Sequence, residues 1–300
     1  MNLAHKILPV LAGIAVSFIF GLSFLFSKSA LDTLKPLELL AHRFSLAVVF
    51  LLIAARSGLI NLRFRPGMFR DLFPLTLFQP VLYFFGETFG VNLTTATESG
   101  LVIALIPVAV TLLGKYYLHE KATWLQWTFI WLSVAGVAII VLAPAGLVLG
   151  RHSVGVLCLL IAVIAAAIYN VLARKFSGEY SPLEITAVMM VTGALIFNLL
   201  YLIALSPKAG YFSAFTDRKA LISLVYLGGL SSVLAFFLMN YMLKRMPASR
   251  AATFINLTTV VSVVAGVLFR GETFGLMQVL GGILILAGVW GSNFCRTDGD

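Results

Sequence analysis

The chain has 300 residues, of which 60% are hydrophobic and 11% are charged, and its mean hydropathy is +1.02. A soluble domain carries about 25% charged residues to keep its surface in water, so this composition excludes an ordinary water-soluble globular protein. The formal net charge of +9 would suggest a nucleic-acid partner for a soluble protein. Here the positions of the charges along the chain matter more, and we expect no nucleic-acid binding.

Apolar segments follow one another along the whole chain. A membrane-spanning helix needs about 20 apolar residues, because the hydrocarbon core is about 30 Å thick and a helix rises about 1.5 Å per residue. Backbone groups in lipid must be hydrogen-bonded within their own segment, which favours helices. We therefore predict an all-α integral membrane protein with ten transmembrane helices, at residues 7–28, 36–56, 71–92, 95–115, 121–143, 153–175, 181–205, 219–243, 248–269 and 273–294. The first segment has no convincing small-residue cleavage site and is therefore interpreted as a span, not a signal peptide.

Two opposite charges lie inside neighbouring predicted spans. Arg43 is about seven residues from the start of span 36–56, and Glu87 is about five residues from the end of span 71–92, so both lie about 8–10 Å deep. An ionisable group inside a span usually faces a cavity or a partner. A structural ion pair and a binding site for the two ends of a zwitterion both fit this pattern. His42 points about 100° away from Arg43 on a helix and is interpreted as a packing residue.

Span 71–92 also carries a polar stripe. Gln79, Tyr83 and Glu87 are four residues apart, which places an amide, a phenol and a carboxylate on one helical face. Such a face either packs against neighbouring helices or lines a cavity, and we predict the cavity. Burial raises the pKa of a carboxyl group in general, so Glu87 is the candidate for proton coupling.

Polar residues also interrupt the apolar runs of the second half. Tyr169 lies in span 153–175, and Asn240 and Tyr241 lie in span 219–243. Hydrogen bonds between helices explain any one of them, typically at under about 2 kcal/mol. We keep all three as weaker candidates for substrate binding.

Three glutamates lie near the ends of predicted spans. Glu120 and Glu272 are close to the starts of the fifth and tenth spans, where a carboxylate stabilises the positive end of a helix dipole. We interpret both as structural. Glu98 lies near the start of the fourth span, and we expect it to be solvated at the membrane interface.

The last predicted span is rich in glycine, which allows helices to approach closely. Its glycines are Gly281, Gly282, Gly288 and Gly291. Packing against the fifth span and a homodimer seam fit equally well, so a homodimer is a possible assembly.

The lysines and arginines are divided unevenly between the loops. With the N-terminus inside, thirteen of the 21 lie on the inner side and seven on the outer side, and Arg43 lies within a span. Cytoplasmic loops of membrane proteins carry an excess of these residues. We therefore predict a multi-pass protein of the cytoplasmic (inner or plasma) membrane with both termini in the cytoplasm.

An internal repeat relates the two halves of the chain. A shift of 152 residues superimposes 84–142 on 236–294, and the matches include Phe84 with Phe236, Ala96 with Ala248, Glu120 with Glu272, and Ala135-Gly136-Val137 with Ala287-Gly288-Val289. We predict one membrane domain made of two five-helix repeats, 1–145 and 146–300. Repeats with an odd number of spans insert in opposite directions, and inverted repeats are common in secondary transporters.

Together these residues resemble the EamA family of the drug/metabolite transporter superfamily, over essentially the whole chain. The resemblance rests on Gly21-Leu22-Ser23-Phe24, Arg43-Phe44, Ala96…Pro107…Glu120, Ala248…Glu272 and the glycine-rich fifth and tenth spans. It implies ten helices, cytoplasmic termini and a central cavity lined mainly by helices 1–4 and 6–9. It also implies export of amino acids and related metabolites or of amphipathic toxic compounds, although some members import. The ninth span departs from the fourth, because it has Thr258-Thr259 where the fourth has Pro107, so the two halves need not bend equally.

We predict a secondary transporter that exports a small metabolite, an amino acid or a related compound, by alternating access. The alternatives are an exporter of amphipathic or cationic drug-like compounds, a proton-coupled importer, and a channel or receptor. A channel would show neither saturation nor counterflow. No Walker A sequence is present, so we expect energy from gradients and not directly from ATP. A membrane-embedded enzyme would need clustered His, Asp or Glu near one interface. The four histidines are scattered, so we expect no enzymatic activity, metal or cofactor.

Overall fold

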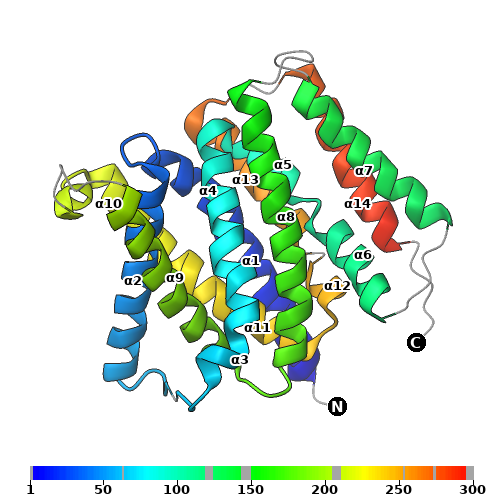
Figure 1. Ribbon diagram of the computed structural model, residues 1–300. Helices are drawn as coiled ribbons and strands as arrows, with labels where there is room; N and C mark the ends of the chain where they lie inside the picture. Colours follow the sequence, from blue (N-terminus) through cyan, green and yellow to red (C-terminus); the bar gives the residue numbers. More distant parts are fainter. Residues whose placement is uncertain are drawn as a thin grey trace.

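The computed structural model describes residues 3–62, 64–118, 124–142, 150–204, 211–252, 254–272 and 275–294. These residues form helices joined by short turns, with no strand among them (Figure 1). The elements are α1 (Leu3–Ala30), α2 (Pro36–Arg56), α3 (Met68–Thr76), η1 (Leu77–Leu82), α4 (Tyr83–Leu93), α5 (Ala96–Ile103), α6 (Ile106–Leu118), α7 (Trp124–Leu142), α8 (Arg151–Phe176), α9 (Pro182–Ala204), η2 (Tyr211–Phe215), α10 (Arg218–Val225), η3 (Tyr226–Ala235), α11 (Phe236–Arg245), α12 (Ala248–Ala252), α13 (Ile255–Arg270) and α14 (Leu276–Phe294). The all-α prediction is confirmed.

Within the part of the chain that the structure describes, six helical segments are long and apolar enough to cross a membrane. They are Ile7–Ala30, Pro36–Arg56, Ala96–Leu113, Arg151–Phe176, Pro182–Ala204 and Arg218–Arg245. The other four predicted spans coincide with shorter or interrupted helices. Ten crossings therefore stay a prediction.

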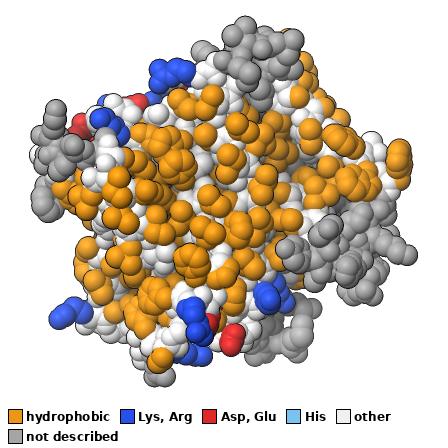
Figure 2. All heavy atoms as spheres, in the orientation of Figure 1, with side chains coloured by type: hydrophobic (Ala, Val, Ile, Leu, Met, Phe, Trp, Pro, Cys, Tyr) orange, Lys and Arg blue, Asp and Glu red, His pale blue; other side chains and the backbone are white. Residues whose placement is uncertain are grey.

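The surface is apolar across the middle of the bundle. Figure 2 shows hydrophobic side chains over most of one face, with Lys and Arg toward its upper and lower edges. Large apolar side chains such as Ile203 and Phe269 are more than 70% exposed. A surface patch of this extent fits contact with lipid and not with water.

The predicted span 71–92 is not one continuous helix. Gln79 has extended backbone angles (φ −145°, ψ 115°) between α3 and α4, and Pro80 follows it. Proline donates no backbone hydrogen bond and disfavours the helical conformation in the residue before it. The single helical face expected for Gln79, Tyr83 and Glu87 is therefore interrupted at its first member.

Two of the three glutamates near span ends have surroundings that differ from the expectation. Glu98 is 4% exposed instead of solvated, and its carboxylate lies 3.3 Å from His152. Glu272 does bind the N-terminus of a helix, but this helix is α5 and not the following α14. Glu120 lies outside the described residues.

Helices α7 and α14 pack along each other at one edge of the bundle (Figure 1). A Cβ atom added at Gly136 would lie 2.6 Å from the Gly281 carbonyl oxygen, and one at Gly291 would collide with the Phe129 ring. Gly281, Gly288 and Gly291 of α14 thus serve packing against α7 within the chain, whereas Gly282 faces Leu101 of α5. The homodimer stays a prediction, and the α14 glycines no longer argue for it.

We expect Gly288→Ala to destabilise the protein more than Gly282→Ala. A Cβ atom at Gly288 would lie 2.5 Å from the Phe129 carbonyl oxygen and 2.7 Å from the Ser133 amide nitrogen, so the two backbones must separate. At Gly282 the nearest atom is 3.2 Å away, at the flexible tip of Leu101. Overpacking of this kind costs about 1–3 kcal/mol. Thermal unfolding in detergent measures the difference, and equal melting temperatures would contradict this account of the α7–α14 contact.

Candidate functional site

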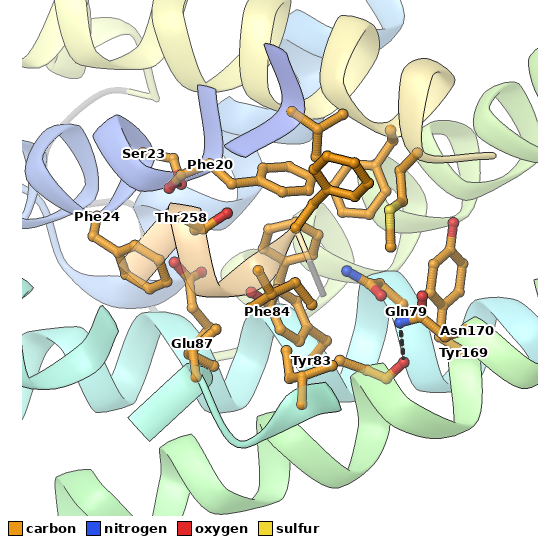
Figure 3. Close-up of a pocket in the computed structure, with 18 of the residues that line it drawn as sticks. Phe20, Ser23, Phe24, Gln79, Tyr83, Phe84, Glu87, Tyr169, Asn170 and Thr258 are labelled. Carbon is orange, nitrogen blue, oxygen red and sulfur yellow. Dashed lines mark hydrogen bonds between the residues drawn. The ribbon is translucent and has the colours of Figure 1, made fainter. Parts of the chain in front are cut away.

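A cavity lies at the centre of the bundle, between the two halves of the chain (Figure 3). Its walls are Val16, Phe20, Ser23, Phe24, Arg43, Gln79, Tyr83, Phe84, Glu87, Ile103, Ile106, Ala166, Tyr169, Asn170, Phe236, Met239, Ala251, Phe254, Ile255 and Thr258. The centre of a water molecule can move through about 40 Å³ of it, which is room for only a few waters. A metabolite would require the cavity to widen.

Arg43 is the buried cation of this cavity, with 1% of its surface exposed. Its Nε donates to Ser232 Oγ and its Nη2 to Ser231 Oγ, each at 2.9 Å. Both serines belong to η3, in the other half of the chain. The guanidinium lies over the Phe84 ring, 4.2 Å from the centroid. Its Nη1 has no hydrogen-bond partner among the residues that the structure describes, so one end of the guanidinium remains available.

Glu87 is the charge nearest to that available end. Its Oε2 lies 3.9 Å from Arg43 Nη1, and both side chains are 2% exposed. This separation is too long for a hydrogen bond. Thr88 donates to the same oxygen at 3.5 Å, a long contact. Arg43 and Glu87 are thus close together, as expected. They form an ion pair without a direct hydrogen bond.

Three further predicted residues also reach the cavity. Gln79, Tyr83 and Tyr169 line it together with Arg43 and Glu87. The two remaining candidates, Asn240 and Tyr241, are not among the residues that line the cavity.

Asn240 lies behind the cavity wall and Tyr241 lies away from it. Asn240 accepts a hydrogen bond from the Tyr169 hydroxyl (2.8 Å) and donates to Thr186 Oγ1 (3.1 Å). It therefore orients a residue of the wall. The Arg245 guanidinium lies over the Tyr241 ring, 3.6 Å from its centroid.

Three polar residues of the wall were missing from the predicted set: Ser23, Asn170 and Thr258. Asn170 donates to the Ala166 carbonyl oxygen at 2.7 Å, and its Oδ1 has no partner. Thr258 Oγ1 is also buried without a partner. Figure 3 shows Thr258 near Glu87 and Asn170 beside Tyr169, toward opposite ends of the cavity. Both are polar residues within apolar runs, which is a signal that many structural residues share.

The chemistry of the cavity is that of an amphipathic site. Aromatic rings form much of its wall, and three of the residues that line it, Arg43, Asn170 and Thr258, each have a buried polar atom without a partner among the described residues. Buried polar atoms are normally hydrogen-bonded, so unpaired donors and acceptors that share one cavity fit a ligand with complementary groups.

Comparison with known proteins assigns the chain to a protein family. The model of the EamA-like transporter family matches residues 7–142 and again residues 153–294. The chain belongs to this family. It is therefore a membrane transporter, and the expected resemblance is confirmed.

Relatives of this EamA-like transporter are themselves named as transporters. The "Uncharacterized transporter YcxC" of Bacillus subtilis (strain 168) is 35% identical over 293 residues, which cover 96% of this chain and 94% of that protein. A "Probable terminal-alkyne amino-acid exporter" of Streptantibioticus cattleyicolor is 29% identical over 194 residues, 65% of this chain and 63% of that protein. A solved crystal structure shares the fold, with a TM-score of 0.67 and 18% identity over 96% of this chain and 99% of that one.

Proposed function

We propose that this EamA-like transporter is a secondary transporter that exports an amino acid or a related small metabolite by alternating access. It would act in the cytoplasmic membrane, with ten spans and both termini in the cytoplasm. The observation that carries the proposal is the unpartnered Nη1 of Arg43 beside the Glu87 carboxylate, inside a cavity between the two halves.

Two observations support inverted repeats, 1–145 and 146–300, as the basis of alternating access. The family model matches once in each of these segments. The cavity lies between them, and Arg43 of the first is held by serines of the second. Inverted halves around a central site are the arrangement that many carriers use.

The surroundings of Arg43 favour a substrate with a carboxylate. A buried cation is costly unless it is paired and hydrogen-bonded. Two nitrogens of Arg43 donate to neutral serine hydroxyls, and the neighbouring Glu87 carboxylate is 3.9 Å away. A substrate carboxylate would accept a hydrogen bond from Nη1, and the ammonium group of the same substrate would then lie near Glu87. This arrangement disfavours cationic drug-like compounds, because Arg43 would repel them.

The export direction is supported by one relative, the amino-acid exporter named above. Proton coupling is supported by the position of Glu87, because a carboxyl group in the cavity can carry a proton in one step and interact with the substrate ammonium in another. No cofactor enters this proposal.

Counterflow in proteoliposomes tests the function. Vesicles loaded with an unlabelled amino acid should take up the same labelled amino acid, and uptake should saturate. Amino acids, nucleosides and organic cations are compared, first by thermal shift to find binders and then by counterflow. Linear uptake without counterflow would indicate a channel, and counterflow of organic cations alone would overturn the amino-acid assignment.

A further inference from the structure

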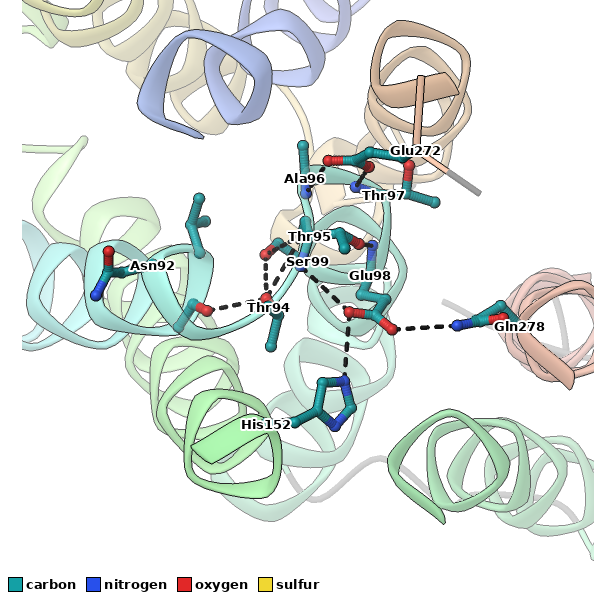
Figure 4. Close-up of polar contacts among 12 residues, drawn as sticks. Asn92, Thr94, Thr95, Ala96, Thr97, Glu98, Ser99, His152, Glu272 and Gln278 are labelled. Carbon is teal, nitrogen blue, oxygen red and sulfur yellow. Dashed lines mark hydrogen bonds and ion pairs between the residues drawn. The ribbon is translucent and has the colours of Figure 1, made fainter. Parts of the chain in front are cut away.

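One end of the bundle is closed by hydrogen bonds between the two halves. It is the end at which α1 and α4 finish and α5 and α8 begin, called here the α5 end and uppermost in Figure 1. Glu272, between α13 and α14, accepts from the backbone amides of Ala96 and Thr97, each at 2.9 Å. Helix α5 therefore begins with its first two amides bound by a carboxylate of the other half (Figure 4).

Further polar contacts across the halves surround this one. Ser262 of α13 donates to the Ala96 carbonyl oxygen at 2.9 Å. Glu98 receives a hydrogen bond from Gln278 of α14 at 3.4 Å and lies 3.3 Å from His152 of α8 (Figure 4). Ala96, Thr97, Glu98 and Ser99 at the start of α5 are all buried, so the other helices cover this end of α5.

These contacts lie directly beyond the cavity. Helix α5 runs from Ala96 at the closed end to Ile103 in the cavity wall, a rise of about 10 Å. Helix α13 runs from Thr258 in the wall to Gly266, which packs against Glu272, a rise of about 12 Å. A solute leaving the cavity toward the α5 end must separate α5 from α13 at this point.

The opposite end is joined less firmly. There Arg65 and Glu184 form an ion pair at 3.3 Å, with the Arg65 side chain 59% exposed, and Tyr180 donates to Asp71 at 2.9 Å. The Arg65 and Asp71 side chains are 59% and 41% exposed, so water screens one partner of each contact and weakens both. The carboxylate on the α5 amides is partly shielded and charge-assisted, which makes it the stronger contact.

We propose that Glu272 is a lock that holds the α5 end closed and must release α5 once in each transport cycle. The proposal rests on alternating access as proposed above. A polar lock suits repeated opening, because water replaces the hydrogen-bond partners of both α5 and Glu272 when they separate. In the proposed orientation the α5 end faces the outside of the cell.

A cysteine beneath the lock tests this proposal. The parent protein carries Ser23→Cys, which places a thiol in the cavity wall, together with Cys158→Ser and Cys295→Ser. Glu272→Gln replaces one accepting oxygen by an NH₂ group that cannot accept from the α5 amides. A membrane-impermeant maleimide, added at the face of the α5 end, should label this variant about tenfold faster than the parent, the effect of one lost charge-assisted hydrogen bond. Labelling from the other face, in inverted vesicles, should become slower.

Two further variants keep the result interpretable. Glu179→Gln removes an exposed carboxylate from a loop at the opposite end and should leave labelling unchanged. Gly266→Ala keeps Glu272 but adds a Cβ atom that would collide with Thr97 Oγ1 of α5 and lie 2.5 Å from Glu272 Oε2, so it presses on both partners of the lock. It should displace the carboxylate and reproduce the faster labelling, which provides a second test if Glu272→Gln folds poorly.

The outcomes separate the lock from the proposed function. If both lock variants label at the parent rate while the parent shows counterflow, the lock is wrong and the transport proposal stands. If the parent shows no counterflow with any solute but both lock variants label faster, closure by Glu272 is supported and the proposed function fails. Faster labelling in Glu179→Gln as well would also overturn the lock, because the effect would not depend on contact with α5.

Discussion

Replacing Glu87 by glutamine should leave the protein folded and remove either transport or its dependence on pH. The substitution keeps the size of the side chain and an oxygen that can accept a hydrogen bond, but it removes the charge and the exchangeable proton. Arg43 keeps both serines and the Phe84 ring, and its contact with Glu87 is 3.9 Å long. Arg43 loses its counter-charge but keeps these contacts, so we expect a loss of stability below the about 3–5 kcal/mol that breaking a buried pair costs.

The measurement is amino-acid counterflow and gradient-driven uptake at several pH values, with thermal unfolding in parallel. Counterflow does not need a proton gradient, so a variant that retains counterflow but loses pH-dependent uptake identifies Glu87 as the proton carrier. Loss of both identifies it as a substrate-binding group. Glu179→Gln, which removes an exposed carboxylate, should behave like the wild type. Unchanged transport with unchanged pH dependence in Glu87→Gln would exclude both roles.

Arg43→Met should have the largest effect, on both stability and transport. It leaves Glu87 as a buried charge without its cation and leaves Ser231 and Ser232 without their partner. Removing one member of a buried pair costs about 3–5 kcal/mol. Transport of carboxylate-bearing substrates should be lost, because the nitrogen that would bind the carboxylate is gone.

The double variant Arg43→Met/Glu87→Gln separates folding from binding. With no unpaired charge left in the cavity, most of the lost stability should return, whereas transport should stay absent. Thermal unfolding of the single and double variants gives the coupling between the two residues. If the double variant recovers transport as well as stability, the pair is only structural and the substrate binds elsewhere.

The positions of Arg43 and Glu87 show how much of the site can be predicted from the sequence. Both could be placed inside spans at similar depth, because depth depends only on the number of residues from a span end and the fixed rise of a helix. Their proximity followed as an expectation. The serines that hold Arg43 could not be predicted, because Ser231 and Ser232 lie 188 and 189 positions away along the chain.

The sequence by itself determined that the chain is helical, lies in a membrane and resembles the EamA family, because composition and apolar segment length are properties of consecutive residues. Tertiary structure decided which residues meet: Gly288 and Gly291 of α14 with α7, Glu272 with α5, and Asn240 with Tyr169 behind the cavity wall. These contacts depend on how each helix is rotated and tilted. In a chain whose helices are apolar on nearly all sides, the hydrophobic pattern does not define that rotation.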